Sequence, residues 1–420
     1  MSQPVDASSR LARRLGTLDA VVIGLAAMIG AGIFAAIGPA AQAAGGGMLI
    51  GLAVAGAVAY CNASSSAQLA ALYPRSGGAY VYGRERLGHL WGFAAGWGFV
   101  VGKIASCAAM ALTFGAYAFP EHARPFAIGA VVALTAVNLG GIRATASIAR
   151  VIVALVLGSL AAAVASMATG DPSWERVGSM TEAGPLGILQ SAGLLFFAFA
   201  GYARIATLGE EVKDPTRTIP RAIAIALGIT LIVYATVTTL ALLAVGPDAL
   251  AESSAPLATA VRAGGLAWAL PLTRIGATIA SLGVLLSLLA GVGRTAFSMA
   301  DEGDLPRWFS AVHPRARVPH RAEIAIAAVV VTIVLVADLR GAIGFSSFAV
   351  LTYYAITNTA ALTLSSAERR TPMAVAVVGV IGCGVLAFTL PWTSVVAGAA
   401  MLLVGVGAWW ILVHRKHTAG

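Results

Sequence analysis

The sequence predicts an all-α membrane protein with about twelve transmembrane helices. The chain is 59% hydrophobic and only 11% charged, whereas soluble domains carry roughly 25% charged residues. Apolar runs follow one another along the chain, and a helix needs about 20 mostly apolar residues to cross a bilayer. The basic residues gather in the short segments between these runs. Because so few charged residues cannot cover a water-facing surface, we expect the apolar runs to lie in the lipid bilayer.

The apolar runs set the boundaries of the predicted helices. Three consecutive glycines at residues 45–47 mark the turn between the first two runs, which otherwise continue into each other. The fourth, ninth and eleventh runs are short, so their ends are the least well defined. The predicted spans cover residues 18–42, 48–72, 90–117, 124–140, 146–168, 187–208, 220–245, 270–298, 323–338, 343–366, 373–390 and 393–413.

The basic residues predict how these spans are oriented. Twenty of the 27 Lys and Arg residues fall on the side of the N-terminus, five on the other side and two within spans. Cytoplasmic loops carry this excess of positive charge. We therefore predict a multi-pass protein of the cell membrane with two cytoplasmic tails, 1–17 and 414–420. The net charge of +9 is then explained by this asymmetry and does not indicate a nucleic-acid partner.

No motif indicates an enzyme, a cofactor or a metal site. Cys61, Cys107 and Cys383 each lie in an apolar run and form no CxxC pair, and the six histidines show no zinc spacing. The polar stretches 209–221 and 299–322 are too short for a nucleotide-binding domain. Because the spans contain almost no Asp, Glu or His, a membrane-embedded enzyme is also disfavoured.

Gly30 and Gly32 lie near the middle of the first span, in the string GAGIF. Two interpretations stay open for them. Small residues let membrane helices pack closely. Alternatively, the glycines mark a break in the helix, as in transporters whose half-helix ends bind a carboxylate or a cation. Unpaired backbone at this depth is tolerated only where it is buried in protein or lines a cavity.

A second candidate break lies in the sixth span, in the string FFAFAGY that ends at Tyr202. Its Gly201 stands five spans after the first break. Corresponding interruptions in two halves of a chain point to a transport site between inverted repeats. The sequence contains no repeat at the level of individual residues, so the predicted symmetry is one of position.

Lys103 lies in the middle of the third span, where a charge costs about 2.5–3.5 kcal/mol on insertion scales. The side chain is either a structural lysine bonded to carbonyls or a functional cation. As a functional group, it would titrate or fill an ion site. Burial lowers the pKa of a lysine, so a role in proton coupling is chemically reasonable.

Several segments together resemble the amino acid–polyamine–organocation permeases. They are residues 30–34, 73–80, 90–97, 196–202, 209–221 (GEEVKDPTRTIPR) and 294–306. The similarity extends in order over nearly the whole chain. It implies the leucine-transporter-like fold, a five-plus-five inverted repeat followed by two helices. The first repeat would cover 18–168, the second 187–366 and the two C-terminal helices 373–413.

The resemblance also implies where the substrate binds. It assigns the amino and carboxylate groups of the substrate to the two breaks. The N–H groups of the first break would bind the carboxylate and the carbonyls of residues 199 to 201 the ammonium, and Tyr202 would help to close the site. The implied residues are Ile29, Gly30, Ala31, Gly32, Ile33, Phe199, Ala200, Gly201 and Tyr202.

Two departures from the family pattern affect specificity and coupling. Ala203 and Arg204 stand where many members that carry cationic amino acids have an acidic residue. Ser159, or its neighbour Gly158, stands where some proton-coupled members have a lysine, so Lys103 is an alternative source of the cation. Arg204 is expected either in the inner vestibule or paired with one of two nearby glutamates. The residues assigned to the inner vestibule or gate are Arg204, Glu210, Glu211 and Arg294.

We therefore predict a secondary active transporter that moves an amino acid by alternating access, coupled to H⁺ or by exchange. A transporter of polyamines or other amines with the same fold is one alternative. A passive channel is another, although channels show repeated filter loops or rings of like charge, which this sequence lacks.

Overall fold

A computed structural model describes residues 15–30, 32–74, 77–141, 146–209, 211–314 and 316–418. Within these ranges the chain is helical, and the only β pairing is an isolated bridge between Leu15 and Val212. The α-helices are α1 (Thr17–Met28), α2 (Gly32–Ala44), α3 (Met48–Leu72), α4 (Ala79–Leu87), α5 (His89–Ala118), α6 (Ala123–Leu139), α7 (Ala146–Thr169), α8 (Gly184–Phe199), α9 (Ala203–Ala206), α10 (Pro215–Glu252), α11 (Pro256–Arg262), α12 (Ala269–Asp301), α13 (His320–Val336), α14 (Leu339–Leu362), α15 (Met373–Thr389) and α16 (Trp392–Thr418).

Nine stretches of the described residues are long and apolar enough to cross a membrane. The first of them, Gly32–Leu72, joins α2 and α3 through the 3₁₀ turn Gly45–Gly47. The predicted twelve spans correspond to these nine when that stretch is divided at its glycines and the 17-residue helices α13 and α15 are added. The all-α membrane class is thus confirmed, and the number twelve stays a prediction.

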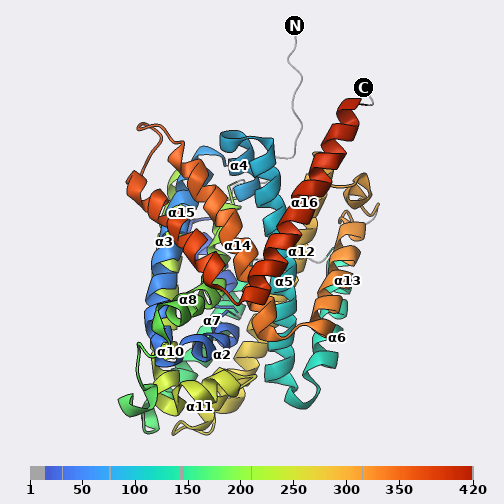
Figure 1. Ribbon diagram of the computed structural model, residues 1–420. Helices are drawn as coiled ribbons and strands as arrows, with labels where there is room; N and C mark the ends of the chain where they lie inside the picture. Colours follow the sequence, from blue (N-terminus) through green and yellow to red (C-terminus); the bar gives the residue numbers. More distant parts are fainter. Residues whose placement is uncertain are drawn as a thin grey trace.

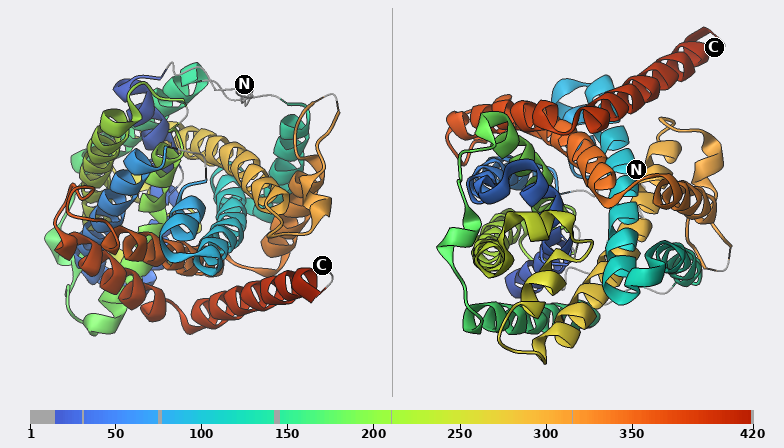
Figure 2. Two further views of the ribbon diagram at one scale, coloured as in Figure 1. Left: turned by 90° about the horizontal axis from the view of Figure 1, so that it is seen from above. Right: turned by 60° about the horizontal axis from the view of Figure 1, so that its bottom comes forward.

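The surface of the helix bundle is apolar, as a bilayer requires. Val336, Phe388 and Leu403 are more than 70% exposed, which would be unfavourable in water. Figure 2 shows α16 running along the outside of the bundle, with its C-terminal part apart from the other helices.

Three helical features lie outside the predicted spans. α4 and α11 are short helices in segments that we predicted as connections. α10 extends to Glu252, beyond the predicted end at residue 245, and bends at Gly246, whose φ of 76° is left-handed. Glycine adopts this conformation without steric cost, and Pro247 cannot donate a hydrogen bond back across the bend.

Opposite ends of the bundle carry different short helices, with α4 at one end and α11 at the other (Figure 1). At the α4 end, the buried carboxylate of Asp304 connects three segments. Its Oδ2 accepts a hydrogen bond from Tyr80 Oη at 2.8 Å, and its Oδ1 accepts one from Trp409 Nε1 at 2.9 Å. His89 Nε2 lies 2.8 Å from Oδ1. Asp304 thereby holds α4, α5 and α16 against the end of α12.

Candidate functional site

The first span is interrupted where the sequence predicted. α1 ends at Met28 and α2 begins at Gly32, while Ala31 lies outside the described residues. The N–H of Ile29 still bonds to Leu25 O at 2.8 Å and closes the last turn of α1. The next α-helix begins at Gly32. The interpretation of the glycines as a helix break is therefore confirmed, although Gly32 also serves close packing, as shown below.

The sixth span is also interrupted at the predicted residues, but differently. α8 ends at Phe199, residues Ala200–Tyr202 form a 3₁₀ turn (η4), and α9 follows from Ala203. The N–H of Ala200 bonds to Phe197 O and that of Ala203 to Gly201 O. The backbone is tightened here and not opened, because its N–H groups keep near neighbours as acceptors.

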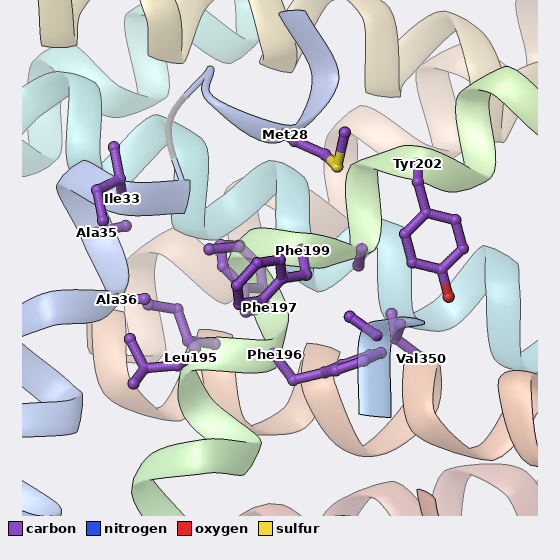
Figure 3. Close-up of a cluster of buried hydrophobic side chains, with 14 of the residues drawn as sticks. Met28, Ile33, Ala35, Ala36, Leu195, Phe196, Phe197, Phe199, Tyr202 and Val350 are labelled. Atoms are coloured by element: carbon purple, nitrogen blue, oxygen red, sulfur yellow. The ribbon is translucent and has the colours of Figure 1, made fainter. Parts of the chain in front are cut away.

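The two breaks lie against each other in the centre of the bundle, where Met28, Ile33, Phe199 and Tyr202 belong to one buried cluster (Figure 3). A Cβ atom on Gly32 would lie 2.6 Å from the Cα of Ala198. One on Gly201 would lie 2.6 Å from the backbone nitrogen of Met28. Only glycine permits this approach of backbone to backbone, so the same glycines both interrupt the helices and bring the interruptions together.

Three buried tyrosines hydrogen-bond to carbonyls beside the breaks. Tyr234 of α10 places its hydroxyl 2.5 Å from Met28 O and 3.0 Å from Ala198 O. Tyr354 of α14 donates to Ala200 O at 3.4 Å. Tyr117 of α5 donates to Phe34 O at 3.2 Å and accepts from Leu257 N. Carbonyls released by an interrupted helix need such partners when they are buried.

The chemistry offered by the two breaks is complementary. The first turn of α2 has N–H groups without helical acceptors, and a helix N-terminus attracts negative charge. The end of α8 presents carbonyls, which attract positive charge. Together the breaks can bind a small molecule with a carboxylate and an ammonium. The described residues contain no cluster of His, Cys, Asp and Glu that could hold a metal ion.

The space beside the first break is nearly closed. A cavity of about 10 Å³ lies against Ile29 and Gly30 and is bounded by Ile152, Val153 and Val156 of α7. By this measure a cavity needs about 10–15 Å³ to hold one water molecule, so no amino acid fits there without movement of the helices. A Cβ on Gly30 would also collide with the Val284 side chain of α12.

Tyr202 points away from the first break. Its ring stacks on that of Tyr354 with centroids 5.1 Å apart, and its side chain is completely buried (Figure 3). Behind these rings, Asn358 Nδ2 donates to Asn62 Oδ1 at 2.6 Å, and Cys383 Sγ lies 3.2 Å from the same oxygen. The expected role of Tyr202 in closing the site would require its side chain to turn.

Lys103 lies buried inside α5, with 7% of its surface exposed. On the same side of α5, Gly96 contacts Met299 of α12 and Ser106 bonds to Ser346 of α14 at 2.7 Å. Helical periodicity thus puts Lys103 in the seam between α12 and α14. The Lys103 ammonium group forms no hydrogen bond or salt bridge with any residue that the structure describes.

Ser159 does not lie at the break. Its hydroxyl donates to Val156 O at 2.8 Å, and its side chain packs against Gly276 of α12. The α7 side chains that face Gly30 precede it by one to two turns and are all apolar. The structure therefore brings no polar side chain of α7 to the first break within the described range.

The residues expected at the inner gate are only partly brought together. Arg204 is exposed and donates to Thr207 Oγ1 at 3.3 Å. Among the described residues it forms no salt bridge with Glu211, whose carbonyl instead accepts from Leu15 N at 3.1 Å. Arg294 is exposed on α12, and Glu210 lies outside the described residues.

Two buried polar residues near these elements escaped the sequence analysis. Glu323 of α13 is 4% exposed and packs against Gly293 of α12. Tyr234 bonds to both breaks, as described above. The available signal was that Tyr234 is the only aromatic residue in the span 220–245. That signal cannot tell a tyrosine at the site from one at the lipid interface.

These features can be set beside known proteins. The family model described as "Amino acid permease" matches residues 15–417. An uncharacterised transporter of Mycobacterium tuberculosis is 60% identical over 407 residues, which are 97% of this chain and 92% of that protein. A branched-chain amino acid permease of Bacillus subtilis is 26% identical over 447 residues, 97% of this chain and 94% of the relative. Cationic amino acid transporter 4 of Homo sapiens is 29% identical over 389 residues, which are 86% of this chain and 61% of that protein.

Proposed function

Because the chain belongs to the amino acid permease family, we propose that it is a secondary active transporter that carries an amino acid across the cell membrane by alternating access. The observation that carries this proposal is the meeting of two interrupted helices. The first N–H groups of α2 have no acceptors within their own helix, and α2 contacts the end of α8 where Gly32 meets Ala198. Every amino acid has a carboxylate and an ammonium, and these two ends match them.

The substrate would bind mainly to backbone. The N–H groups of Gly30, Gly32 and Ile33 would hold the carboxylate, together with the neighbouring Ile29 and Ala31. The carbonyls of Phe199, Ala200 and Gly201 would accept from the ammonium. Backbone groups recognise what all amino acids share, so the packing of the surrounding side chains would choose among them.

A transport cycle by movement of the helices is supported by the size of the cavity at Gly30. Its volume of about 10 Å³ is far below that of an amino acid, so binding requires α1 to separate from α7 or α12. The contacts of Gly30 in that direction are side chains, whereas Gly32 and Gly201 contact backbone. Separation on the Gly30 side therefore needs only rotamer changes and rigid-body shifts.

A neutral side chain is favoured for the substrate. Relatives named for branched-chain and for cationic amino acids both match, so their names do not choose between these classes. Ala203 and the exposed Arg204 directly follow η4, and neither can neutralise a cationic side chain. An arginine nearby would instead repel it.

In the proposed five-plus-five repeat, α1–α7 and α8–α14 would form the two halves, with α15 and α16 added. The two breaks fall in the first span of each half. The excess of basic residues on the N-terminal side favours cytoplasmic termini. Lys103 is the proposed coupling group, because it is a buried cation in the seam between α12 and α14.

The test is uptake of radiolabelled amino acids into proteoliposomes, with and without a pH gradient. Saturable uptake or exchange of at least one neutral amino acid is expected, stimulated by an inward proton gradient or by internal substrate. A passive channel would show neither saturation nor competition. The absence of uptake and exchange across all twenty amino acids and the common polyamines would refute the proposal.

A further inference from the structure

A groove between α5 and α12 lies outside the candidate substrate site. It is formed by the C-terminal end of α5 and the first turns of α12, at the end of the bundle opposite α4 (Figure 1). Tyr117 and Arg274 border it, together with the apolar residues Pro271, Ile275 and Ile279. Its volume of about 320 Å³ is within the range of small-molecule sites, roughly 300–1,000 Å³. The groove is therefore large enough to hold a ligand.

The groove faces away from the two breaks. α12 directs Val284 toward Gly30 and places Gly276 against Ser159 of α7. The residues of α12 that border the groove lie on another face of the helix, because they follow one another at helical spacing. Ile275 on this face is 54% exposed. A ligand in the groove would therefore contact the bilayer and not the substrate.

Arg274 brings a positive charge into this groove. The side chain is half-buried, and its Nε donates to the carbonyl oxygen of Tyr117 at 2.9 Å. A guanidinium group has five N–H donors, and the other four find no acceptor among the residues that the structure describes. The residues that border the groove include no Asp or Glu. The planar guanidinium is thus free to bind an anionic group such as a phosphate.

The aromatic residues at the ends of the two helices indicate the level of the lipid headgroups. Trp268 directly precedes α12, Phe119 directly follows α5, and both are exposed. Exposed aromatic residues of membrane proteins gather at the interface between lipid and water. Ile279 lies about 7.5 Å further along α12 than Arg274, toward the middle of the span. The charged end of the groove is therefore level with the headgroups, and its apolar end is level with the acyl chains.

We propose that this groove binds an anionic phospholipid, with its phosphate on the guanidinium group of Arg274 and one acyl chain along Ile275 and Ile279. Charge and apolar surface occur here in the order in which a phospholipid presents its own. The site is independent of the solute that the chain transports. A lipid that contacts both α5 and α12 would hold these two helix ends together, so its binding should stabilise the folded protein.

The first experiment titrates the purified full chain in detergent with phosphatidylglycerol. Binding is followed by native mass spectrometry and by thermal unfolding. Phosphatidylcholine with the same acyl chains, sn-glycerol 3-phosphate and inorganic phosphate are the comparison ligands. We expect phosphatidylglycerol to bind about tenfold more tightly than phosphatidylcholine and to raise the melting temperature by at least about 2 °C. Equal binding of the two lipids, or equal binding of glycerol phosphate without acyl chains, would overturn the proposal.

Arg274→Gln and Arg262→Gln form a matched pair of variants. Arg262 ends α11 at the same end of the bundle and is exposed, but it does not border the groove. Arg274→Gln should raise the Kd for phosphatidylglycerol about tenfold, whereas Arg262→Gln should leave it within twofold of wild type. The same loss in both variants would mean that lipid is attracted by positive charge in general, and our inference would be wrong.

A third experiment leaves Arg274 in place, because Arg274→Gln also removes the hydrogen bond to Tyr117 and this variant can fail to fold. The photoreactive residue p-benzoylphenylalanine replaces Ile275 in one protein and Ile232 in another. Ile232 of α10 is also exposed, at 69%. In vesicles in which phosphatidylglycerol is the minor lipid, cross-links from position 275 should contain severalfold more of it than cross-links from position 232. Equal proportions at both positions, or no lipid cross-link at position 275, would contradict the site.

Discussion

The two breaks differ in how the backbone departs from the α-helix. At the first, the helix stops at Met28 and restarts at Gly32. At the second, the chain passes through the 3₁₀ turn Ala200–Tyr202 and keeps short-range hydrogen bonds. The first break therefore supplies free N–H donors at the start of α2, whereas the second supplies carbonyl acceptors without losing its donors. In the proposed function, these two breaks would bind the two charged ends of a zwitterionic substrate.

The surroundings of the breaks differ as well. Gly30 faces apolar side chains, among them Val153 and Val284. Behind the second break, Tyr202 faces a buried polar group that includes Asn62 and Asn358. At the first break only backbone groups are available to bind a polar ligand, whereas polar side chains of α3 and α14 lie behind the second break. We expect the first break to be the more mobile of the two.

The largest effect should follow from closing the space between the breaks. In Gly32→Ala and Gly201→Ala the new methyl group would meet backbone atoms 2.6 Å away, which cannot move without displacing a helix. Overpacking of this kind costs about 1–3 kcal/mol or more. We expect a loss of transport of at least a hundredfold and a lower melting temperature, measured by uptake and by thermal unfolding in detergent.

Gly30→Ala and Gly158→Ala are compared with Gly32→Ala to test whether the loss of transport depends on the contacts of each glycine. A Cβ on Gly30 would meet the Val284 side chain and, at 2.6 Å, the backbone oxygen of Ala26 in its own turn, whereas Gly158 has no atom within 4 Å of its Cβ position. Transport should therefore fall in Gly30→Ala as well as in Gly32→Ala and stay normal in Gly158→Ala. Equal activity of Gly32→Ala and Gly158→Ala would mean that the contact between the breaks does not matter for transport.

The second effect concerns energy coupling and not binding. Lys103→Met keeps the volume of a buried side chain but removes its charge. If this cation couples transport to protons, the accumulation driven by a pH gradient should fall to about the level of equilibration. Exchange of internal for external substrate should persist, because both breaks stay intact. The measurement is the ratio of internal to external substrate at steady state.

Ser106→Ala is the control for Lys103. Ser106 lies three residues further along α5 and bonds to Ser346 of α14 at 2.7 Å, so its removal disturbs the same helix interface without changing charge. Full proton-driven accumulation by Lys103→Met would leave the lysine a structural role and remove it from the coupling mechanism.

The sequence predicted most reliably those features that depend on neighbouring residues alone, such as helix breaks and apolar spans. Glycines in mid-span predicted both breaks, because unpaired backbone at that depth requires a special environment. The apolar runs predicted the main helices within a few residues. By contrast, α4 and α11 are short and partly polar, and their helical state depends on packing that no local pattern shows.

Side-chain directions could not be predicted. Tyr202 was assigned to the site by its position after Gly201, but its ring stacks on Tyr354 on the far side. Ser159 was assigned to coupling by correspondence with a family position, and that role stays a prediction; its hydroxyl donates to Val156 O within α7. Tyr234 was missed because its partners are carbonyls of two other helices, a relation set by tertiary packing alone.

The smallest effect is expected far from both breaks. Arg86 of α4 forms a salt bridge with Glu368, which lies between α14 and α15, at 2.7 Å. The guanidinium, with help from Ser365, lowers the pKa of Glu368 from 4.5 to about 2. A carboxyl group whose pKa is lowered by folding stabilises the protein above its unfolded pKa and loses that contribution as the pH falls through the folded value.

Between pH 5 and 8 the Glu368 carboxylate therefore stays ionised, and its contribution to stability is constant. Glu368→Gln should lower the melting temperature slightly at pH 7 and leave the KM and its pH dependence unchanged, since this partly buried pair lies at one end of the bundle and surface ion pairs contribute little. The melting temperatures of variant and wild type should start to approach each other below about pH 4 and become equal only below about pH 2, the pKa of Glu368 in the folded protein. A changed KM or pH optimum in this variant would show that the end of the bundle that carries α4 acts on the breaks, and that the difference between the two breaks alone does not account for transport.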